Sequence, residues 1–267
     1  MPTVSIIMSV YNQDKNDIIN TSINSIINQT FDDFEVIICN DGSINKTESY
    51  LKEWKNRDNR IKIINNSSNK GLAYSLNKCI NHSKGEFLVR HDIDDYSEPK
   101  RIEKQIKFLQ AHNDISIVGS NINLFNDFGI WGKMTYPRNV SPKDFLFNVP
   151  FTHGAITIRK KDICKAGGYL VSKQTRRTED YELMMRMYSL GFKMYNLQEF
   201  LYNFREDKNA IKRRKYKYKI DEALIRYKGF KKLGLMPQGL IYTIKPLIVG
   251  LIPTMILSKL KDIYYKR

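Results

Sequence analysis

Three carboxylates stand within four positions at Asp92-Ile93-Asp94-Asp95, directly after the apolar run 87–89. A buried strand that ends in an acidic turn predicts carboxylates at the carboxyl edge of a sheet, where open α/β sheets bind their ligands. Neighbouring carboxylates resist being ionised together in a cleft. A hard divalent cation completed by phosphate oxygens would relieve that repulsion. Taken alone, the same four residues also fit a solvated acidic turn.

The first hundred residues alternate between apolar runs and stretches with helical spacing. We expect strands at 4–10, 34–39, 61–64 and 86–90, separated by helices at 18–27, 44–55 and 71–80. This order predicts an α/β fold with a doubly wound, mostly parallel sheet and its strand–helix loops on one edge. Tyr11-Asn12, the turn 40–43 and the acidic cluster would then meet at that edge, although they are distant in sequence.

After residue 112 the alternation becomes less regular. We expect a strand at 115–118, a hairpin or meander at 121–136 and a strand at 155–158. Gly167-Gly168-Tyr169 marks a turn, and a helix at 181–190 should end at Gly191. The second half of the chain therefore differs in architecture from the first.

Two common nucleotide-binding loops are absent from the sequence. Dinucleotide-binding folds need G-x-G-x-x-G after the first strand, and P-loop enzymes need G-x-x-x-x-G-K-[ST]. The first glycine here is Gly42, after the second strand. Cys39, Cys79 and Cys164 are far apart and predict neither a zinc site nor a disulfide framework. The chain begins with a strand-like run and shows no signal-peptide pattern, so we expect a cytoplasmic protein.

Positive charge is concentrated toward the C-terminus. Residues 205–232 carry twelve Lys or Arg against four Asp or Glu. The resulting excess of eight positive charges (12 − 4) is half of the net charge of the chain, which is +16. Such a block favours an anionic partner: nucleic acid, a phosphorylated ligand or an acidic membrane surface. The uncharged run 246–258 has 13 residues, whereas a membrane span needs about 20. It therefore predicts an interfacial segment, with an ordinary packed helix as the alternative.

Several blocks, taken in chain order, resemble the large inverting glycosyltransferase family 2 over residues 3–205. They are the run 4–12, Asn40-Asp41-Gly42-Ser43, Asn69-Lys70-Gly71-Leu72 with Asn77, Asp92-Ile93-Asp94-Asp95, Pro150-Phe151-Thr152-His153-Gly154, and Thr178-Glu179-Asp180-Tyr181-Glu182-Leu183 with Arg186. The similarity is closest to bacterial enzymes of capsule, exopolysaccharide or O-antigen assembly. Two residues depart from the pattern: Asn40, where an acid is frequent, and His91.

The resemblance implies a GT-A fold, a nucleotide-sugar donor and a divalent metal, Mn²⁺ or Mg²⁺. A UDP-sugar is the donor this family uses most often. By matching position, the residues that would bind the donor are Ser9, Tyr11, Asp41, Lys70 and Asp92. Asp94 would ligate the metal and Asp180 would be the general base, while Asp95, His153 and Glu179 lie on the acceptor or donor side with their roles open.

Those assignments agree with the chemistry of inversion. Displacement at an anomeric carbon needs a base on the acceptor hydroxyl and a cation on the departing diphosphate. One carboxylate cannot serve both tasks, so two acidic sites are required. Asp94 and Asp180 would supply them if the second half of the domain folds over the sheet edge.

The same resemblance divides the chain into three parts. Residues 1–112 would form the nucleotide-sugar-binding half, 113–204 the acceptor-binding half with the base, and 205–267 a basic helical extension. We expect the extension to hold the enzyme peripherally at the inner face of the cell membrane. A saccharide or polyprenyl-linked acceptor would lie there, and nucleic acid is not an expected partner.

Two other functions remain open from the sequence. A basic nucleic-acid-binding protein would use the positive block, but the acidic edge would repel the polymer and no nucleic-acid module is recognised. A catalytically silent sugar-nucleotide-binding subunit would keep the fold without turnover, and Asp94 and Asp180 argue against it. Individually, Asp41 also fits simple turn chemistry, and Asp180 fits a helix N-terminus.

Overall fold

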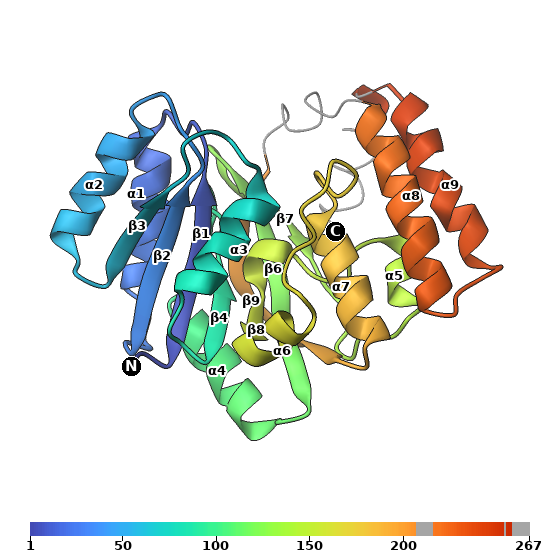
Figure 1. Ribbon diagram of the computed structural model, residues 1–267, viewed down its shortest axis with the longest axis horizontal. Coiled ribbons are helices and arrows are strands. Elements are labelled where there is room, and N and C mark those ends of the chain that lie inside the picture. Colours follow the sequence, from blue (N-terminus) through green and yellow to red (C-terminus); the bar gives the residue numbers. More distant parts are fainter. Residues whose placement is uncertain (207–215, 254, 258–267) are drawn as a thin grey trace.

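One mixed sheet runs through the protein. The strands are β1 (Val4–Val10), β2 (Phe34–Asn40), β3 (Ile61–Asn65), β4 (Phe87–Arg90), β5 (Tyr96–Ser97), β6 (Ile115–Asn126), β7 (Gly129–Met134), β8 (Thr157–Arg159) and β9 (Lys193–Arg205). In the computed structural model, which describes residues 1–206, 216–253 and 255–257, they follow the order β3-β2-β1-β4-β8-β6-β9-β5, with β7 paired to β6 (Figure 1). Part of the basic block and the last ten residues lie outside the described residues.

The N-terminal half of the sheet is parallel, as the alternating pattern predicts. β1 pairs with β2 and β4, and β2 pairs with β3, all in parallel. Nearly every residue of β1, β2 and β4 is buried. Strands covered on both faces need apolar side chains on both, which explains their almost continuous apolar runs.

Helices cover the two faces of this sheet (Figure 1). They are α1 (Asn16–Ile27), α2 (Thr47–Arg57), α3 (Leu72–His82), α4 (Arg101–Ala111), α5 (Asp144–Phe147), α6 (Lys160–Lys165) and α7 (Glu179–Ser189). Apolar residues of α1, α2 and α4 form one buried cluster with the sheet, and those of α3, α6 and α7 form another. Each cluster packs one layer of helices against one face of the sheet. The loops that follow the strands are therefore anchored at both ends by well-packed elements.

The second half of the sheet mixes strand directions. β8 lies antiparallel between β4 and β6, whereas β6 and β9 are parallel. The hairpin expected at 121–136 is confirmed by the antiparallel pair β6 and β7. The strand expected at 155–158 starts only at Thr157, because His153–Ala155 forms a 3₁₀ turn, η1. Gly154 lets this turn approach Tyr202 closely, since a Cβ on it would lie 2.2 Å from Oη.

Two further helices, α8 (Lys217–Lys232) and α9 (Gly239–Leu251), pack beside α7 at the end of the molecule away from β3 (Figure 1). Ile225 and Phe230 of α8 are buried in the cluster that contains the apolar side of α7. Nη1 of Arg226 donates a hydrogen bond to the backbone oxygen of Leu146 at 3.0 Å. Among the helices that the structure describes, none is long and apolar enough to cross a membrane.

Candidate active site

The loop after β2 folds onto the segment before α3. Asp41 is buried, and its carboxylate accepts hydrogen bonds from the backbone N–H groups of Lys70 and Gly71, both at 2.8 Å. Nδ2 of Asn66 donates a third at 2.7 Å. Gly42 permits this fold, since its φ is +70° and a Cβ there would lie 2.4 Å from the facing backbone. Asp41 therefore shapes the loops, and its contact with a nucleoside stays a prediction.

The other three residues predicted for the nucleoside pocket remain accessible. Ser9 is half-buried near the end of β1, and Tyr11 and Lys70 are exposed. Asn12 ties the first loop to the second, because its backbone N–H donates to Oγ of Ser43 at 3.0 Å. The loops after β1 and β2 and the segment before α3 are thus neighbours at the carboxyl edge, as the sequence predicts.

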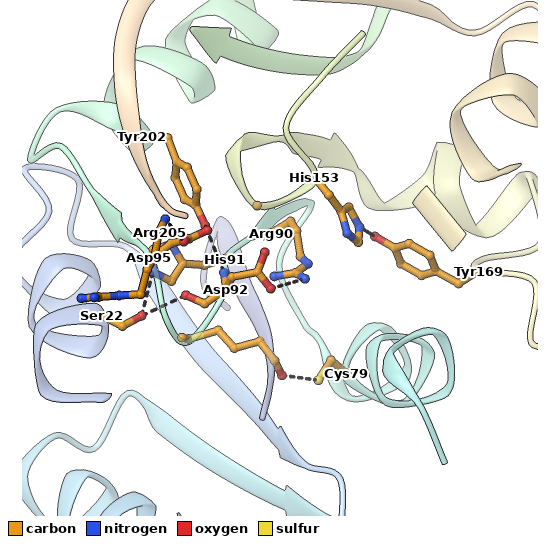
Figure 2. Close-up of polar contacts among 12 residues, drawn as sticks. Ser22, Cys79, Arg90, His91, Asp92, Asp95, His153, Tyr169, Tyr202 and Arg205 are labelled. Carbon is orange, nitrogen blue, oxygen red and sulfur yellow. Dashed lines mark hydrogen bonds and ion pairs between the residues drawn. The ribbon is translucent and has the colours of Figure 1, made fainter. Parts of the chain in front are cut away.

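Asp92, the first member of the acidic cluster, is held by three contacts. Nη2 of Arg90 donates to its Oδ1 at 2.6 Å (Figure 2). Its backbone N–H donates to Oη of Tyr202 at 3.2 Å, and Oγ of Ser22 donates to its backbone oxygen at 3.0 Å. The Asp92 side chain is nevertheless 28% exposed. It is therefore oriented by the protein and still open to a ligand.

Asp95, the third carboxylate, is an internal anchor. It is 2% exposed, and it accepts hydrogen bonds from Oη of Tyr202 and the backbone N–H of Arg205, both at 2.7 Å. Burial, with the charges of Asp94 and Asp92, raises the pKa of Asp95 well above its usual range. Asp95 thus ties the acidic loop to the end of β9, which gives a structural role to the residue whose role the sequence left open.

The buried side chains of His91 and Arg101 form hydrogen bonds with the segments on either side of the acidic loop. Nε2 of His91 lies 3.0 Å from Oγ of Ser22, and its Nδ1 lies 3.3 Å from Oγ of Ser97. Burial, together with Arg101, lowers the pKa of His91 well below its usual range, so the ring is neutral. Nη2 of Arg101 donates to the backbone oxygens of Arg90 and Gly154, both at 2.8 Å. The unusual histidine before the cluster is therefore part of its scaffold.

Asp94, the second carboxylate of the acidic cluster, has an exposed side chain. In the described part of the chain, no other residue donates a hydrogen bond to its side chain, which keeps solvent access. The chain packed around the loop desolvates it partly and, with Asp92, raises the pKa of Asp94 to about 6. A divalent cation would remove this penalty.

The carboxylates of the acidic loop fit a metal ion whose remaining ligands are diphosphate oxygens. Within residues 1–206, 216–253 and 255–257, no three His, Cys, Asp or Glu side chains are grouped as a complete metal site. Mg²⁺ and similar hard cations often bind through one or two carboxylates, with phosphate and water oxygens filling the remaining positions. Asp94, with Asp92 beside it, offers that kind of partial site.

The second acidic pair opens helix α7. Glu179 is buried and Asp180 is half-buried at the N-terminal turn. Burial, together with the neighbouring Glu179, raises the pKa of Asp180 to about 7. The backbone N–H of Tyr181 donates to Oδ1 of Asp180 at 2.8 Å, which favours the ionised form. A carboxylate poised near neutral pH suits a general base.

Tyr169 is buried and contacts His153. Burial raises the pKa of its phenol, the charge of Arg90 lowers it, and the charges of Asp180, Glu179 and Asp92 raise it. Oη of Tyr169 lies 2.7 Å from Nε2 of His153 (Figure 2).

Asn77 and His153 fix the position of that tyrosine. Nδ2 of Asn77 donates to the backbone oxygen of Tyr169, and its Oδ1 accepts from the Tyr169 backbone N–H, both at 2.8 Å. Burial, with Arg90, lowers the pKa of His153 well below its usual range, so this residue is a neutral partner of the phenol. In the sequence, Gly167-Gly168-Tyr169 indicates only a turn and Arg90 only the end of a strand, so neither Tyr169 nor Arg90 carries a local functional signal.

The family model described as "Glycosyl transferase family 2" matches residues 5–168. This chain belongs to glycosyltransferase family 2. EpsE of Bacillus subtilis (strain 168), which is named as a glycosyltransferase, is 38% identical to it over 267 residues, covering 100% of this chain and 94% of EpsE. The O-antigen biosynthesis glycosyltransferase WbnJ of Escherichia coli is 36% identical over 187 residues, covering 69% of this chain and 71% of WbnJ.

A further Escherichia coli relative of this glycosyltransferase is named UDP-Gal:alpha-D-GlcNAc-diphosphoundecaprenol beta-1,3-galactosyltransferase. It is 30% identical over 260 residues, covering 95% of this chain and 93% of the relative. Staphylococcus aureus TarS 1-349 in complex with UDP-GlcNAc has a similar structure, with a TM-score of 0.68 at 18% identity, over 93% of this chain and 71% of that one.

Mannosyltransferase PcManGT of Pyrobaculum calidifontis, in complex with GDP-Man and Mn²⁺, gives a TM-score of 0.62 at 17% identity, over 98% of this chain and 80% of that one. At these identities the two solved structures establish the fold alone. The GT-A fold expected from the sequence is confirmed.

Adjacent members of the acidic cluster should respond differently to substitution. Asp95→Ala leaves the Tyr202 hydroxyl and the Arg205 backbone N–H without their acceptor. We expect it to lower the free energy of unfolding by about 1–3 kcal/mol. Asp94→Ala should change that free energy by less than about 0.5 kcal/mol and should abolish Mn²⁺ binding in the presence of a nucleoside diphosphate. Urea unfolding and calorimetric Mn²⁺ titration measure the two effects, and equal stability losses would contradict the division of roles.

Proposed function

We propose that this glycosyltransferase transfers a sugar, with inversion, from a UDP-sugar to a hydroxyl of a saccharide or polyprenyl-diphosphate-linked acceptor in surface polysaccharide synthesis. The observation that carries the proposal is the presence of two acidic groups: Asp92, held by Arg90 and still partly exposed, beside the exposed Asp94, and Glu179 with Asp180 at the start of α7. The names of the relatives, which include an O-antigen enzyme and a transferase acting on a diphosphoundecaprenol-linked sugar, support the acceptor class.

On the donor side, the loops after β1 and β2 and the segment before α3 would enclose the nucleoside, which the half-buried Ser9 and the exposed Tyr11 and Lys70 would line. Asp92, held by Arg90, would face the ribose and the sugar. Asp94 would hold Mn²⁺ or Mg²⁺. When bound, the metal would neutralise charge that develops on the leaving diphosphate.

On the acceptor side, Asp180 would act as the base. Its pKa of about 7 lets it be ionised in much of the population near neutral pH and still accept a proton. In the transfer step, the acceptor oxygen bonds to the anomeric carbon and the diphosphate leaves with the bonding electron pair. The hydroxyl proton moves to the Asp180 carboxylate. His153 and Tyr169 would border the same space.

Removing the base should stop transfer without preventing donor binding. We expect Asp180→Asn to lower kcat by at least about 100-fold while the Kd for the nucleotide sugar stays nearly constant. Nucleoside diphosphate release is measured with an acceptor and a panel of nucleotide sugars, in Mn²⁺ or in EDTA, and EDTA should abolish it in the wild type.

Asp17→Asn is the matched control, because Asp17 occupies the same position near the N-terminus of α1. It removes an equivalent helix-terminal charge and should leave kcat unchanged. An Asp180→Asn protein that keeps most of its activity would remove Asp180 from the role of base. Absence of turnover with any donor, combined with salt-sensitive binding to nucleic acid, would favour the nucleic-acid alternative instead.

We also propose that the enzyme is peripheral to the inner face of the cell membrane through α8 and α9. Apolar side chains at helical spacing stay exposed on α9: Ile241, Ile244, Ile248 and Leu251. α8 adds exposed Ile220, Leu224 and Tyr227. Exposed lysines flank them at Lys217, Lys228, Lys231 and Lys232. An apolar stripe bordered by lysines complements an anionic lipid surface.

A charged substitution in this stripe tests the membrane proposal. We expect the full chain to sediment with vesicles that contain anionic lipid, less so in high salt. Ile241→Glu combined with Ile248→Glu should weaken binding by at least about tenfold, because two apolar side chains leave the interface. Phe128→Glu is the control, since Phe128 is 99% exposed in the β6–β7 turn. The membrane proposal would be contradicted if the wild type, the double variant and Phe128→Glu bound the vesicles equally. Self-association of the protein through the stripe, without vesicle binding, would also contradict it.

A further inference from the structure

A cavity outside the acidic site lies between β7 and α5. Its volume is about 510 Å³, which is in the range of pockets that bind small ligands in proteins. Its wall is formed by the end of β7 and the residues that follow it, by α5 and the residues after it, and by Phe200 of β9. None of the described residues that form this wall is a candidate donor, metal or base residue, so the acidic site does not account for the cavity.

The wall of the cavity combines aromatic rings with polar groups that the fold does not use. Phe147 is 59% exposed, and Nζ of Lys133 lies 5.0 Å from the centre of the Phe200 ring. In the part of the chain that the structure describes, the side chains of Thr135 and Asn148 form no hydrogen bond. A sugar ring presents C–H faces and a rim of hydroxyl groups, so aromatic faces beside unused donors and acceptors suit a saccharide.

Two contacts connect the cavity wall with elements of the candidate active site. Oη of Tyr136, in the wall, lies 2.6 Å from Oγ1 of Thr152, the residue before η1. The hydroxyl of Tyr181, the residue after Asp180, donates to the backbone oxygen of Phe145 in α5. α5 therefore forms one wall of the cavity and packs on the first turn of α7 (Figure 1). A ligand in the cavity would be held by elements in contact with both η1 and α7.

The same wall contacts α9. The rings of Phe147 and Tyr242 meet edge-on, with their centroids 5.0 Å apart. Nζ of Lys245 donates to the backbone oxygen of Phe147 at 3.1 Å. The exposed apolar stripe described above belongs to this helix. An acceptor anchored in a lipid surface at the stripe would therefore bring its saccharide close to the cavity.

We propose that this cavity binds the saccharide of the acceptor and holds it for transfer. The inference rests on the proposed function, because it assigns a binding site to the acceptor of that reaction. The rings of Phe147 and Phe200 cover the C–H faces of the sugar. Lys133, Thr135 and Asn148 contact its hydroxyl groups, and the linkage to the lipid leaves past α9. The residues of this wall, rather than the acidic residues, then select the saccharide.

Filling the cavity from an exposed position tests the assignment. Thr135→Trp adds an indole to the wall and removes no hydrogen bond of the described chain. Nucleoside diphosphate release is measured with Mn²⁺, a nucleotide sugar, and methyl or octyl glycosides of hexoses, N-acetylhexosamines, deoxyhexoses and uronic acids as acceptors. For each glycoside that the wild type accepts, Thr135→Trp should raise the acceptor KM at least about tenfold, while the donor KM stays within about twofold.

Ile130→Trp is the matched control for an added indole. Ile130 is 54% exposed on the same hairpin and does not form part of the cavity wall. The control should leave the acceptor KM and the donor KM at their wild-type values. Phe200→Leu should raise the acceptor KM about two- to tenfold because the aromatic face is lost. Phe200→Tyr keeps that face and should stay within about twofold of the wild type.

Direct binding of the saccharide is measured without turnover. The full chain is loaded with Mn²⁺ and UDP, and saturation-transfer NMR detects the methyl glycosides that bind to it. At least one methyl glycoside should bind to the wild type and to Ile130→Trp, and its signal should be lost with Thr135→Trp.

Unchanged acceptor KM and unchanged glycoside binding in Thr135→Trp would overturn the proposal. An equal loss in Ile130→Trp, or no binding of any glycoside to the wild type, would overturn it too. A loss confined to the octyl glycosides would assign the cavity to the lipid chain instead of the saccharide. Failure of the proposed function would look different: methyl glycosides would bind to the wild type and not to Thr135→Trp, yet no donor would release its nucleoside diphosphate.

Discussion

Repulsion between carboxylates confined at one edge of the sheet is the constraint on which the rest of the site depends. The acidic side chains involved are Asp92, Asp94, Asp95, Glu179 and Asp180. Four of them are accommodated in three different ways. Asp95 is buried with donors and has a strongly raised pKa, and Asp92 is paired with Arg90. Burial, with a neighbouring carboxylate in each case, raises the pKa of Asp94 to about 6 and that of Asp180 to about 7. Under the proposed function, these two groups are the ones suited to bind a cation and to accept a proton.

The fold maintains this arrangement by joining segments that are distant in sequence. The parallel half of the sheet ends in the acidic loop, while the mixed half supplies Tyr202 and Arg205 from β9 to hold it. β8 lies antiparallel beside β4, and the turn η1 that precedes it packs against Tyr202. Asn77 of α3 holds Tyr169 through two backbone hydrogen bonds. Rigid contacts of this kind are what a preorganised site requires.

Much of this could be predicted from the sequence, because strand periodicity and the polar loops are local signals. The parallel strands and the edge location of Asp41 and the acidic cluster follow from them. The fine structure could not be predicted. The partner of Asp95 lies 107 residues away, and no local pattern encodes that contact. Arg90 ends an apolar strand, so its type alone did not distinguish a surface cation from a buried one. The strand expected at 155–158 begins later because the preceding 3₁₀ turn packs closely against Tyr202, which only a glycine at position 154 allows.

The most direct test of the two-carboxylate account is the position of the metal. Crystals grown with Mn²⁺ and a nucleotide sugar, or its nucleoside diphosphate, can be measured at a wavelength where manganese scatters anomalously. We expect one strong anomalous peak beside the Asp94 carboxylate and the diphosphate oxygens, with the Asp180 carboxylate free of metal. A peak on the Glu179–Asp180 pair, or a diphosphate bound without any metal near Asp94, would contradict it.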